Sequence, residues 1–499
     1  MAGLRLSSAP GRWALLATVL GTSLAFLDAT IVNIALPAIG ADLHAPLSGL
    51  QWTLNGYTLA LAGLILLGGS LSDRYGRRRV FLVGVVWFAA ASTLCALAPN
   101  LGWLVAARVL QGVGAALLTP GSLALIQASF DPRDRARAVG AWSGLAGVAT
   151  AVGPFLGGWL IEGPGWRWLF LINLPLSVVV IAVALRHLPE SRDEAATGRF
   201  DVVGAALGAV ALAGVTYALI AAPEPGGARV AGTAAVAGLV AAVGFLAVER
   251  LRANPMLPLS LFRSGQFSAV NAVTVVVYAA LGGVSFLFML QLQVVVGLPP
   301  VAAGAALLPV TVLMLALSAR VGKLAQRVGP RWPMSAGGTL AGLGVLMLAQ
   351  VSAGSSYVGE IMPATSLFGL GLSLIVAPLT ATVLATAEVR RAGIASGVNN
   401  AVARAGQLLA VAGLPVLVGL SGSDYRDPAV FDGAFRLAML ICAGALVAGA
   451  LLTVVTIRDD ALRETPSHTP VVRPRCPTHC ALAGPPLEPD EEAQPAQER

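Results

Sequence analysis

Two stretches that share one pattern indicate how this chain is organised. Residues 69–78 are Gly-Ser-Leu-Ser-Asp-Arg-Tyr-Gly-Arg-Arg, and residues 322–331 are Gly-Lys-Leu-Ala-Gln-Arg-Val-Gly-Pro-Arg. Both fit Gly-x-Leu-x-x-Arg-x-Gly-x-Arg, and each follows a long apolar segment. Positive charge in cytoplasmic loops would explain the arginines. It would not explain why both stretches have glycines at the same positions. The repeat therefore predicts two duplicated halves, as in many transporters. Gln326 stands where the first copy has Asp73, so the halves are not functionally equal.

The composition indicates that most of the surface faces lipid. Of the 499 residues, 56% are hydrophobic and 11% are charged, and the mean hydropathy is +0.79. Soluble globular proteins carry about 25% charged residues. The net charge of +7 does not indicate a nucleic-acid partner, because the charges lie in short loops between apolar segments rather than in one patch. We therefore expect a lipid bilayer around the chain and no nucleic acid.

The apolar segments predict about fourteen membrane-spanning helices, since each span needs about 20 mainly apolar residues. They lie at residues 13–37, 50–71, 80–98, 101–125, 138–161, 167–186, 202–222, 230–249, 268–292, 301–320, 333–351, 358–381, 393–420 and 434–457. The first is too long for a signal peptide and has no obvious cleavage site, so we expect it to be retained.

Arginine and lysine set the predicted orientation. With the N-terminus in the cytoplasm, alternate loops hold basic clusters such as residues 74–79 and 320–331, whereas the opposite loops hold few basic residues. By the positive-inside rule, an even number of spans then places both termini in the cytoplasm. The predicted location is the cytoplasmic (inner) membrane of a bacterium, crossed many times.

Several motifs resemble those of the major facilitator superfamily, in its fourteen-span drug/proton antiporter branch. Residues 69–78 resemble the signature loop of the superfamily. Residues 27–37, Leu-Asp-Ala-Thr-Ile-Val-Asn-Ile-Ala-Leu-Pro, resemble the first-span motif of that branch, and residues 108–114, Arg-Val-Leu-Gln-Gly-Val-Gly, resemble the fourth-span motif associated with proton coupling. The fifth-span antiporter motif is matched by Gly147, Gly153, Pro154, Gly157 and Gly158, and residues 166–175 and 397–400 are also typical.

The resemblance covers residues 13–457 and implies a domain organisation. We expect an all-α membrane protein of the major facilitator fold that works by alternating access. The predicted parts are a cytoplasmic N-terminus at 1–12, a six-helix bundle at 13–186, a linker with two extra spans at 187–267, a second six-helix bundle at 268–457 and a cytoplasmic tail at 458–499. The tail is polar and rich in proline, so we expect it to be disordered.

Asp28 is the residue that points most directly to function, because a carboxylate within a lipid-spanning helix is costly. Burial favours a neutral carboxyl group and a nearby cation favours the carboxylate, so a group between these influences can take up and release a proton. The alternative is an ion pair that only locks two helices together. The sequence favours proton coupling.

Arg108 is the predicted partner of Asp28. Asp28 lies nine residues before Pro37, roughly 13 Å below the outer surface at about 1.5 Å per residue. Arg108 lies seven residues into the fourth span, roughly 10 Å below the same surface. Gln111 is three residues further on and shares the face of Arg108. We therefore predict a contact between Asp28 and Arg108, direct or through Gln111 or water, and the resemblance assigns proton coupling to the same residues.

The loop at 69–78 has a predicted mechanical role. The resemblance implies a latch between helices, made in one state and broken in the other, from Gly69, Asp73, Arg74, Gly76, Arg77 and Arg78. The alternative is a solvated charged loop. In the fifth span, glycines let a neighbouring helix press close and proline permits a bend. General packing of small residues is the alternative, and the resemblance favours an exporter.

A sparsely polar cavity between the halves is expected to hold the substrate. The candidates are Asn33, Asn55, Tyr57, Asn271, Tyr278, Gln291, Asn399, Asn400, Arg404 and Gln407, each of which could instead be a packing residue. Arg404 has no mid-span acid in its half, so it could contact substrate or backbone carbonyl groups, and a structural role is equally compatible. Few polar residues suit amphipathic substrates, and the single mid-membrane carboxylate favours neutral, zwitterionic or weakly acidic ones.

The predicted function is therefore proton-coupled antiport that exports small amphipathic drugs or a natural product. The alternative is a proton symporter for a small nutrient or metabolite. We expect no enzyme, because no P-loop, paired metal ligands or nucleophile motif is found. Cys476 and Cys480 flank His479, but without a second ligand pair we predict no metal site. We expect no cofactor, energy from the proton gradient, and function as a monomer.

Overall fold

The computed structural model describes residues 4–192, 201–252, 255–386 and 392–459. Within these ranges the secondary structure is helical, with no strand beyond one isolated bridge between Leu4 and Phe130. The predicted all-α class is confirmed. The tail after residue 459, including Cys476 and Cys480, lies outside the described residues.

The first half of the chain forms seven helices in the described ranges, and three of them begin at polar capping residues. Their bounds are α1 (Ala9–Asp42), α2 (Leu47–Tyr75), α3 (Arg77–Ala96), α4 (Leu101–Ser129), α5 (Pro132–Glu162), α6 (Trp168–Leu171) and α7 (Asn173–His187). The side chains of Ser8, Asn100 and Asp131 accept hydrogen bonds from the first-turn N–H groups of α1, α4 and α5. These caps satisfy backbone donors that have no partner within the helix.

The remaining helices belong to the linker and to the second half of the chain. Their bounds are α8 (Val202–Ala221), α9 (Gly227–Leu251), η1 (Leu259–Arg263), α10 (Gly265–Leu290), η2 (Gln291–Val295), α11 (Pro300–Ala305), α12 (Leu308–Val328), α13 (Arg331–Leu348), η3 (Tyr357–Ile361), α14 (Met362–Ala385), α15 (Ala392–Leu417), η5 (Asp424–Arg426) and α16 (Pro428–Thr456). Ser264 caps α10 and Asp427 caps α16.

Thirteen helical segments of the described chain are long and apolar enough to cross a membrane. Each coincides with a predicted span. The remaining predicted span, 333–351, is helical as α13 but is not among the thirteen. This helix has only 18 residues, and Arg331, Trp332 and Pro333 at its start lower the mean hydropathy of the whole helix. The fourteen-span count and the cytoplasmic placement of both termini therefore stay predictions.

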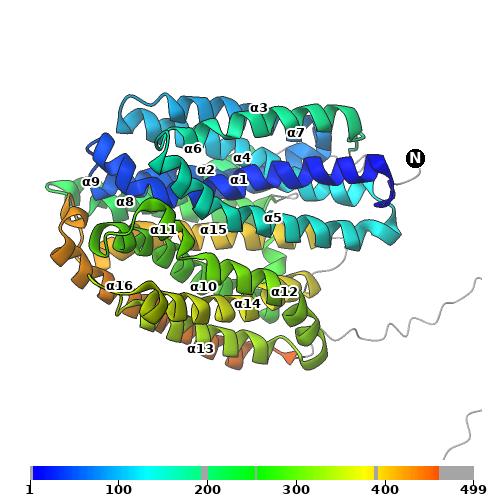
Figure 1. The fold of residues 1–499 in the computed structure, drawn as a ribbon. Helices are drawn as coiled ribbons and strands as arrows, with labels where there is room; N and C mark the ends of the chain where they lie inside the picture. The colour runs from blue at the N-terminus through cyan, green and yellow to red at the C-terminus, as the bar shows by residue number, and fades with distance from the viewer. Residues whose placement is uncertain (1–3, 193–200, 253–254, 387–391, 460–499) are drawn as a thin grey trace, which may run out of the picture. The chain divides into compact units, whose positions relative to one another are not determined.

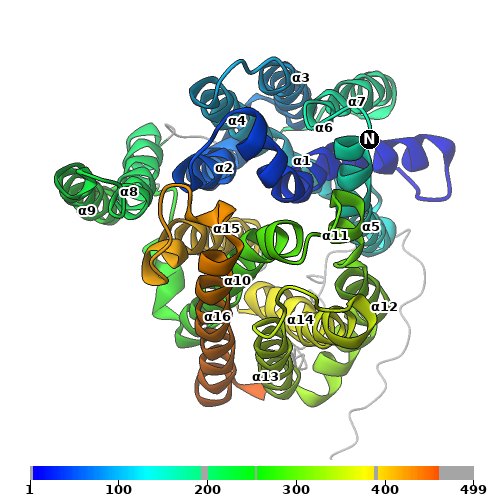
Figure 2. The same cartoon turned by 60° about the vertical axis from the view of Figure 1, so that its left-hand side comes forward.

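Helix packing keeps each predicted bundle together and brings the linker helices against both. In the first half, α4 packs against α2 and α3, and α1 lies alongside α5 (Figure 1). In the second half, α13 packs against α14 and α16, and α10 packs against α15 and α16. The α8–α9 pair lies beside α2 and α15 (Figure 2). The linker helices thus touch one helix from each half through α8.

Candidate functional site

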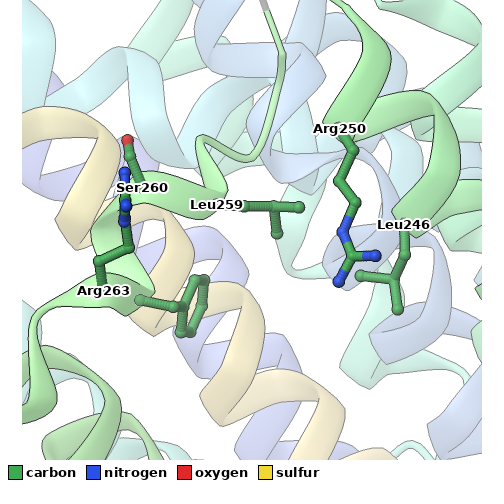
Figure 3. A pocket seen from close by; sticks show the side chains of 6 residues that line it. Leu246, Arg250, Leu259, Ser260 and Arg263 are labelled. Atoms are coloured by element: carbon green, nitrogen blue, oxygen red, sulfur yellow. The ribbon is translucent and has the colours of Figure 1, made fainter.

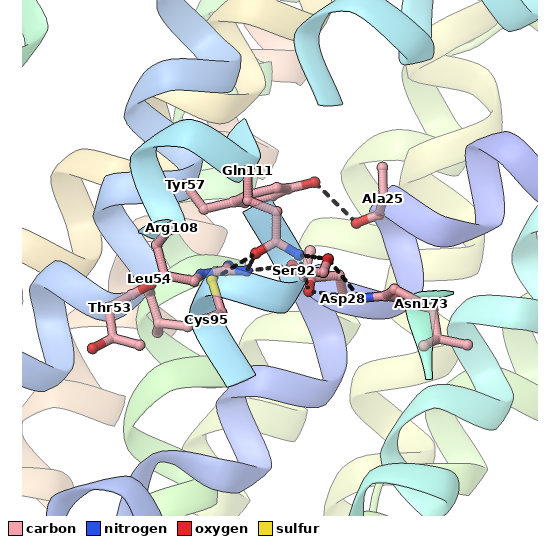
Figure 4. A network of polar contacts seen from close by, with 12 residues as sticks. Ala25, Asp28, Thr53, Leu54, Tyr57, Ser92, Cys95, Arg108, Gln111 and Asn173 are labelled. Atoms are coloured by element: carbon pink, nitrogen blue, oxygen red, sulfur yellow. Dashed lines mark hydrogen bonds and ion pairs between the residues drawn. The ribbon is translucent and has the colours of Figure 1, made fainter. Parts of the chain in front are cut away.

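Asp28 and Arg108 meet inside the first half. Nη1 of Arg108 lies 2.5 Å from Oδ2 of Asp28, and both side chains are 1% exposed (Figure 4). The predicted contact between α1 and α4 is therefore confirmed, and it is direct. The role of this pair in moving protons stays a prediction.

Gln111 joins the two charged groups to each other. Its Nε2 donates to Oδ1 of Asp28 at 2.8 Å, and its Oε1 accepts from Nη1 of Arg108 at 2.6 Å. The amide thereby bridges both ends of the ion pair from one turn further along α4. Nε of Arg108 donates to the backbone oxygen of Thr53 on α2 at 3.0 Å, which fixes the guanidinium plane.

Two further residues of the network were not predicted. Ser92 on α3 accepts from Nε2 of Gln111 at 2.8 Å. Asn173 on α7 donates through Nδ2 to Oδ1 of Asp28 at 3.4 Å and to Oγ of Ser92 at 3.3 Å. Both are fully buried. In the sequence, Asn173 was marked only by its place in residues 166–175, which resemble the antiporter branch. Ser92 is a single serine in an apolar helix, and nothing in the sequence distinguishes it.

Tyr57 belongs to this network, although we predicted it for the cavity. Its ring centroid lies 4.4 Å from the guanidinium carbon of Arg108, and its hydroxyl donates to the backbone oxygen of Ala25 at 3.1 Å. A guanidinium over an aromatic face is stabilised by the ring quadrupole. Cys95 packs beside it, with Sγ 3.6 Å from Oε1 of Gln111. Arg108 is therefore enclosed by an anion, an amide and an aromatic ring.

A second polar group lies in the C-terminal half. Nδ2 of Asn399 on α15 donates to Oδ1 of Asn271 at 3.2 Å and to Oγ1 of Thr274 at 2.8 Å, both on α10. Further along α15, Nη1 of Arg404 donates to Oε1 of Gln407 at 3.1 Å. The structure thus brings the predicted residues Asn271 and Asn399 together across α10 and α15, and pairs Arg404 with Gln407 on α15.

The other predicted cavity residues make no hydrogen bond to these groups in the described ranges. Nε2 of Gln291 donates to the backbone oxygen of Val351 at 2.7 Å and to Oδ1 of Asp432 at 2.6 Å, within the packing of the second half. Asn33 bonds back to its own helix at Ala29, and Asn55 is buried with no partner for Nδ2 among the described residues. Asn400 and Tyr278 are partly buried.

Contacts between the halves gather at the end predicted to face outside. Nε2 of Gln51 on α2 donates to the backbone oxygens of Val411 at 2.8 Å and Ala412 at 3.1 Å on α15. Gln293 of η2 donates to the backbone oxygen of Ile34 on α1 at 3.0 Å. These bonds join the ends of α1 and α2 to the second half and hold that end closed.

Three glycines of the fifth span let α5 lie close to α1 and α11. A Cβ at Gly153 would lie 2.5 Å from Oγ1 of Thr30, and one at Gly157 would lie 3.2 Å from Cγ2 of Ile31, both on α1. At Gly158 it would lie 2.5 Å from Cα of Val301 on α11, and Pro154 presents its backbone oxygen to the same helix.

Gly147, by contrast, has no neighbour within 4 Å of an added Cβ in the described part of the chain. The same holds for Gly140 and Gly144 on the same helix. The close glycine contacts of α5 thus lie toward its outer end.

The predicted latch forms a charged cluster between helices of the first half. Asp73 and Arg77 pair at 2.8 Å between the end of α2 and the start of α3. Glu190, which follows α7 and was not predicted, lies 3.9 Å from Nε of Arg78 and 3.7 Å from Nε of Arg79. The latch thus joins the end of α2, the start of α3 and the segment that follows α7.

The remaining latch residues lie around the same turn. The Arg74 guanidinium carbon lies 6.0 Å from the centroid of the Tyr75 ring, and a Cβ at Gly69 would lie 3.7 Å from Cβ of Pro120 on α4. Gly76 (φ 109°) and its repeat partner Gly329 (φ 92°) end α2 and α12 in the left-handed region that favours glycine. The repeat is therefore structural as well as sequential.

One pocket lies away from these clusters. It measures about 590 Å³ and is lined by Leu246, Arg250, Leu259, Ser260, Phe262 and Arg263, at the end of α9 and along η1 (Figure 3). No predicted substrate residue lines it. In the described ranges no three His, Cys, Asp or Glu side chains are grouped to hold a metal ion.

The chain matches known proteins along most of its length. The family described as the Major Facilitator Superfamily matches residues 18–411. The chain is 38% identical over 389 residues to "Multidrug resistance protein Stp" of Mycobacterium tuberculosis, covering 78% of this chain and 72% of the relative. It is 36% identical over 481 residues to "Probable actinorhodin transporter" of Streptomyces coelicolor, covering 92% and 82%.

A further relative and a solved structure extend the comparison. "Tetracenomycin C resistance and export protein" of Streptomyces glaucescens is 37% identical over 416 residues, covering 82% of this chain and 76% of the relative. A bacterial homolog of the human lysosomal transporter Spinster, solved in an inward-facing and unoccupied conformation, has a TM-score of 0.64 at 16% identity, covering 92% of this chain and 100% of that one. The latter comparison shows the fold.

Proposed function

The chain belongs to the Major Facilitator Superfamily, and from this premise we propose that it exports drugs or a natural product from the cytoplasm in exchange for protons. It is a multi-pass protein of the bacterial cytoplasmic membrane, and a transporter rather than an enzyme. The names of its relatives, which include antibiotic resistance and export proteins, support export over the nutrient symport that the sequence left open.

The proposal of proton coupling rests on Asp28. It is a fully buried carboxylate that receives hydrogen bonds from Arg108, Gln111 and Asn173. A proton on Asp28 would remove the negative charge that compensates Arg108. Because the contacts of Asp28 reach α4 and α7 directly and α3 through Ser92, its protonation state would bias how these helices pack against α1.

The fold offers a route from Asp28 to the other half. α1 packs against α5, and α5 packs against α11 through Gly158. A shift of α1 on protonation would therefore act on the outer contact between the halves. The hydrogen bonds between the described parts of the two halves lie at the outer end, which supports a state that takes up its substrate from the cytoplasm. In this proposal the proton gradient supplies the energy for transport and no cofactor is required. A single chain transports the substrate.

Transport into everted membrane vesicles tests this proposal. With an imposed proton gradient, we expect the wild type to accumulate members of a panel of fluorescent amphipathic dyes, and Asp28→Asn to lose that accumulation. Asp42→Asn is the matched control, because Asp42 lies at the end of the same helix in an exposed ion pair with Arg167 at 2.8 Å. Gradient-dependent accumulation that survives in Asp28→Asn would contradict a coupling role for Asp28.

A further inference from the structure

Arg404 is a second arginine within the membrane, and it lies where the two halves meet. It occupies the middle of α15 (Ala392–Leu417) and is partly buried. Its guanidinium carbon lies 5.8 Å from the ring centroid of Phe26 on α1, across the boundary between the halves. Phe26 is two residues from Asp28, so Arg404 lies at a similar depth in the bilayer.

Unlike Arg108, Arg404 has no counter-ion in the structure as described. None of the described carboxylates lies within 4.0 Å of it, and Asp28 is already paired with Arg108. A guanidinium group carries five N–H donors. The one hydrogen bond found for Arg404, across the described ranges, goes to the neutral amide of Gln407. Most of its hydrogen-bonding capacity and all of its charge are therefore uncompensated by the described side chains.

The cost of this charge depends on the conformation. A cation near the centre of a bilayer is costly unless water or an anion accompanies it. Arg404 is partly exposed in this structure, so water can hydrate it. In a state that closes around the substrate, that water is lost. An anion that enters with the substrate would replace it.

We infer that Arg404 is the anion-binding group of the transport site, and that the exported compound carries a carboxylate, sulfonate or phenolate on an aromatic body. The planar guanidinium suits two-pronged binding of such oxyanions. Phe26 offers an aromatic surface next to the charge. This inference rests on the proposed export function and narrows its substrate class.

Binding of matched acid and amide probes tests the inference. The probes are anthracene carboxylate, pyrene carboxylate and pyrene sulfonate, each compared with its neutral amide. Dissociation constants are measured by fluorescence titration of the full-length protein in lipid nanodiscs, with empty nanodiscs subtracted. We expect the wild type to bind at least one acid more tightly than its amide.

Variants of Arg404 then identify the charge as the cause. We expect Arg404→Gln to weaken acid binding about tenfold or more, because a charged hydrogen-bond partner is lost, and to leave amide binding unchanged. Arg404→Lys should retain part of the preference. Arg436→Gln is the matched control, since Arg436 is exposed on α16. Equal weakening of acids and amides, or no acid preference in the wild type, would overturn the inference.

Uptake of the same probes separates this inference from the proposed function. If acids bind through Arg404 but a proton gradient drives no accumulation of them in everted vesicles, the anion site stands and the export proposal fails for them. If amides accumulate and acids neither bind nor accumulate, export stands and the anion site is wrong.

Discussion

Nη1 of Arg108 and Oδ2 of Asp28 lie 2.5 Å apart in an ion pair from which water is excluded, since both side chains are 1% exposed. Removing two charges from water is expensive, and their attraction repays the cost only when other hydrogen bonds complete the geometry. Here Gln111 and the backbone oxygen of Thr53 complete it. The pair is therefore stable as a unit and sensitive to the loss of either member.

A double substitution should separate stability from transport. Arg108→Met or Asp28→Leu alone leaves one buried charge unpaired, and we expect each to lower the free energy of unfolding by about 3–5 kcal/mol. The Asp28→Leu/Arg108→Met protein should recover most of that loss, because it buries no charge, while proton-driven transport stays absent. Melting temperatures in detergent and vesicle uptake check this. Recovery of transport in the double variant would exclude a proton-coupling role for the pair.

Loss of the Asn173 amide should destabilise the buried network around Asp28. Asn173 donates to the Asp28 carboxylate and to the Ser92 hydroxyl, and hydrogen bonds of this kind contribute about 0.5–3 kcal/mol. We therefore expect Asn173→Leu to lower the free energy of unfolding by about 1–3 kcal/mol. Melting temperatures in detergent check this. The control is Ser177→Ala, on the same helix, whose hydroxyl has no hydrogen-bond partner among the described residues. An unchanged melting temperature in Asn173→Leu, or an equal loss in the control, would contradict the prediction.

The glycine contacts of α5 should be sensitive at one end of the helix and tolerant at the other. Gly158→Ala places a Cβ 2.5 Å from Cα of Val301, and such overpacking costs about 1–3 kcal/mol. Gly147→Ala meets no described atom within 4 Å and should be neutral or stabilising by up to about 1 kcal/mol, because alanine favours helix. Melting temperatures of the two variants should therefore move differently. Equal effects would show that Gly158 is not a close-packing position.

Gln51 should hold the outer end closed. Its amide donates two hydrogen bonds to backbone oxygens of α15, each contributing about 0.5–1.5 kcal/mol. In Gln51→Leu we expect a larger population with the outer ends apart. Electron–electron distance measurements between spin labels at Leu97 and Ala429, both exposed, would report it. Gln350→Leu, an exposed glutamine after α13, is the control. An unchanged distance distribution would assign the closure to other contacts.

Much of the fold could be predicted because lipid imposes simple rules on a sequence. Every predicted span lies on a helix, since twenty apolar residues in a row have few alternatives in a bilayer. The ends were less predictable. α1 runs from Ala9 to Asp42, beyond the predicted 13–37 at both ends, because a helix continues past the apolar layer until a cap or a turn ends it. The apolar pattern is also weaker in α13, because Arg331, Trp332 and Pro333 at its start lower its mean hydropathy.

The sequence by itself determined the spans, the internal repeat, and Asp28 with Arg108 as partners, because a charge inside a membrane needs compensation at its own depth. Only the tertiary structure decided that Ser92 and Asn173 complete their network, that Tyr57 belongs to it, and that Gln51 bonds across the halves. Neutral side chains such as these are common in membrane helices and follow no spacing rule. Their partners lie up to 361 residues away along the chain, so they can be recognised only when folding brings the helices together.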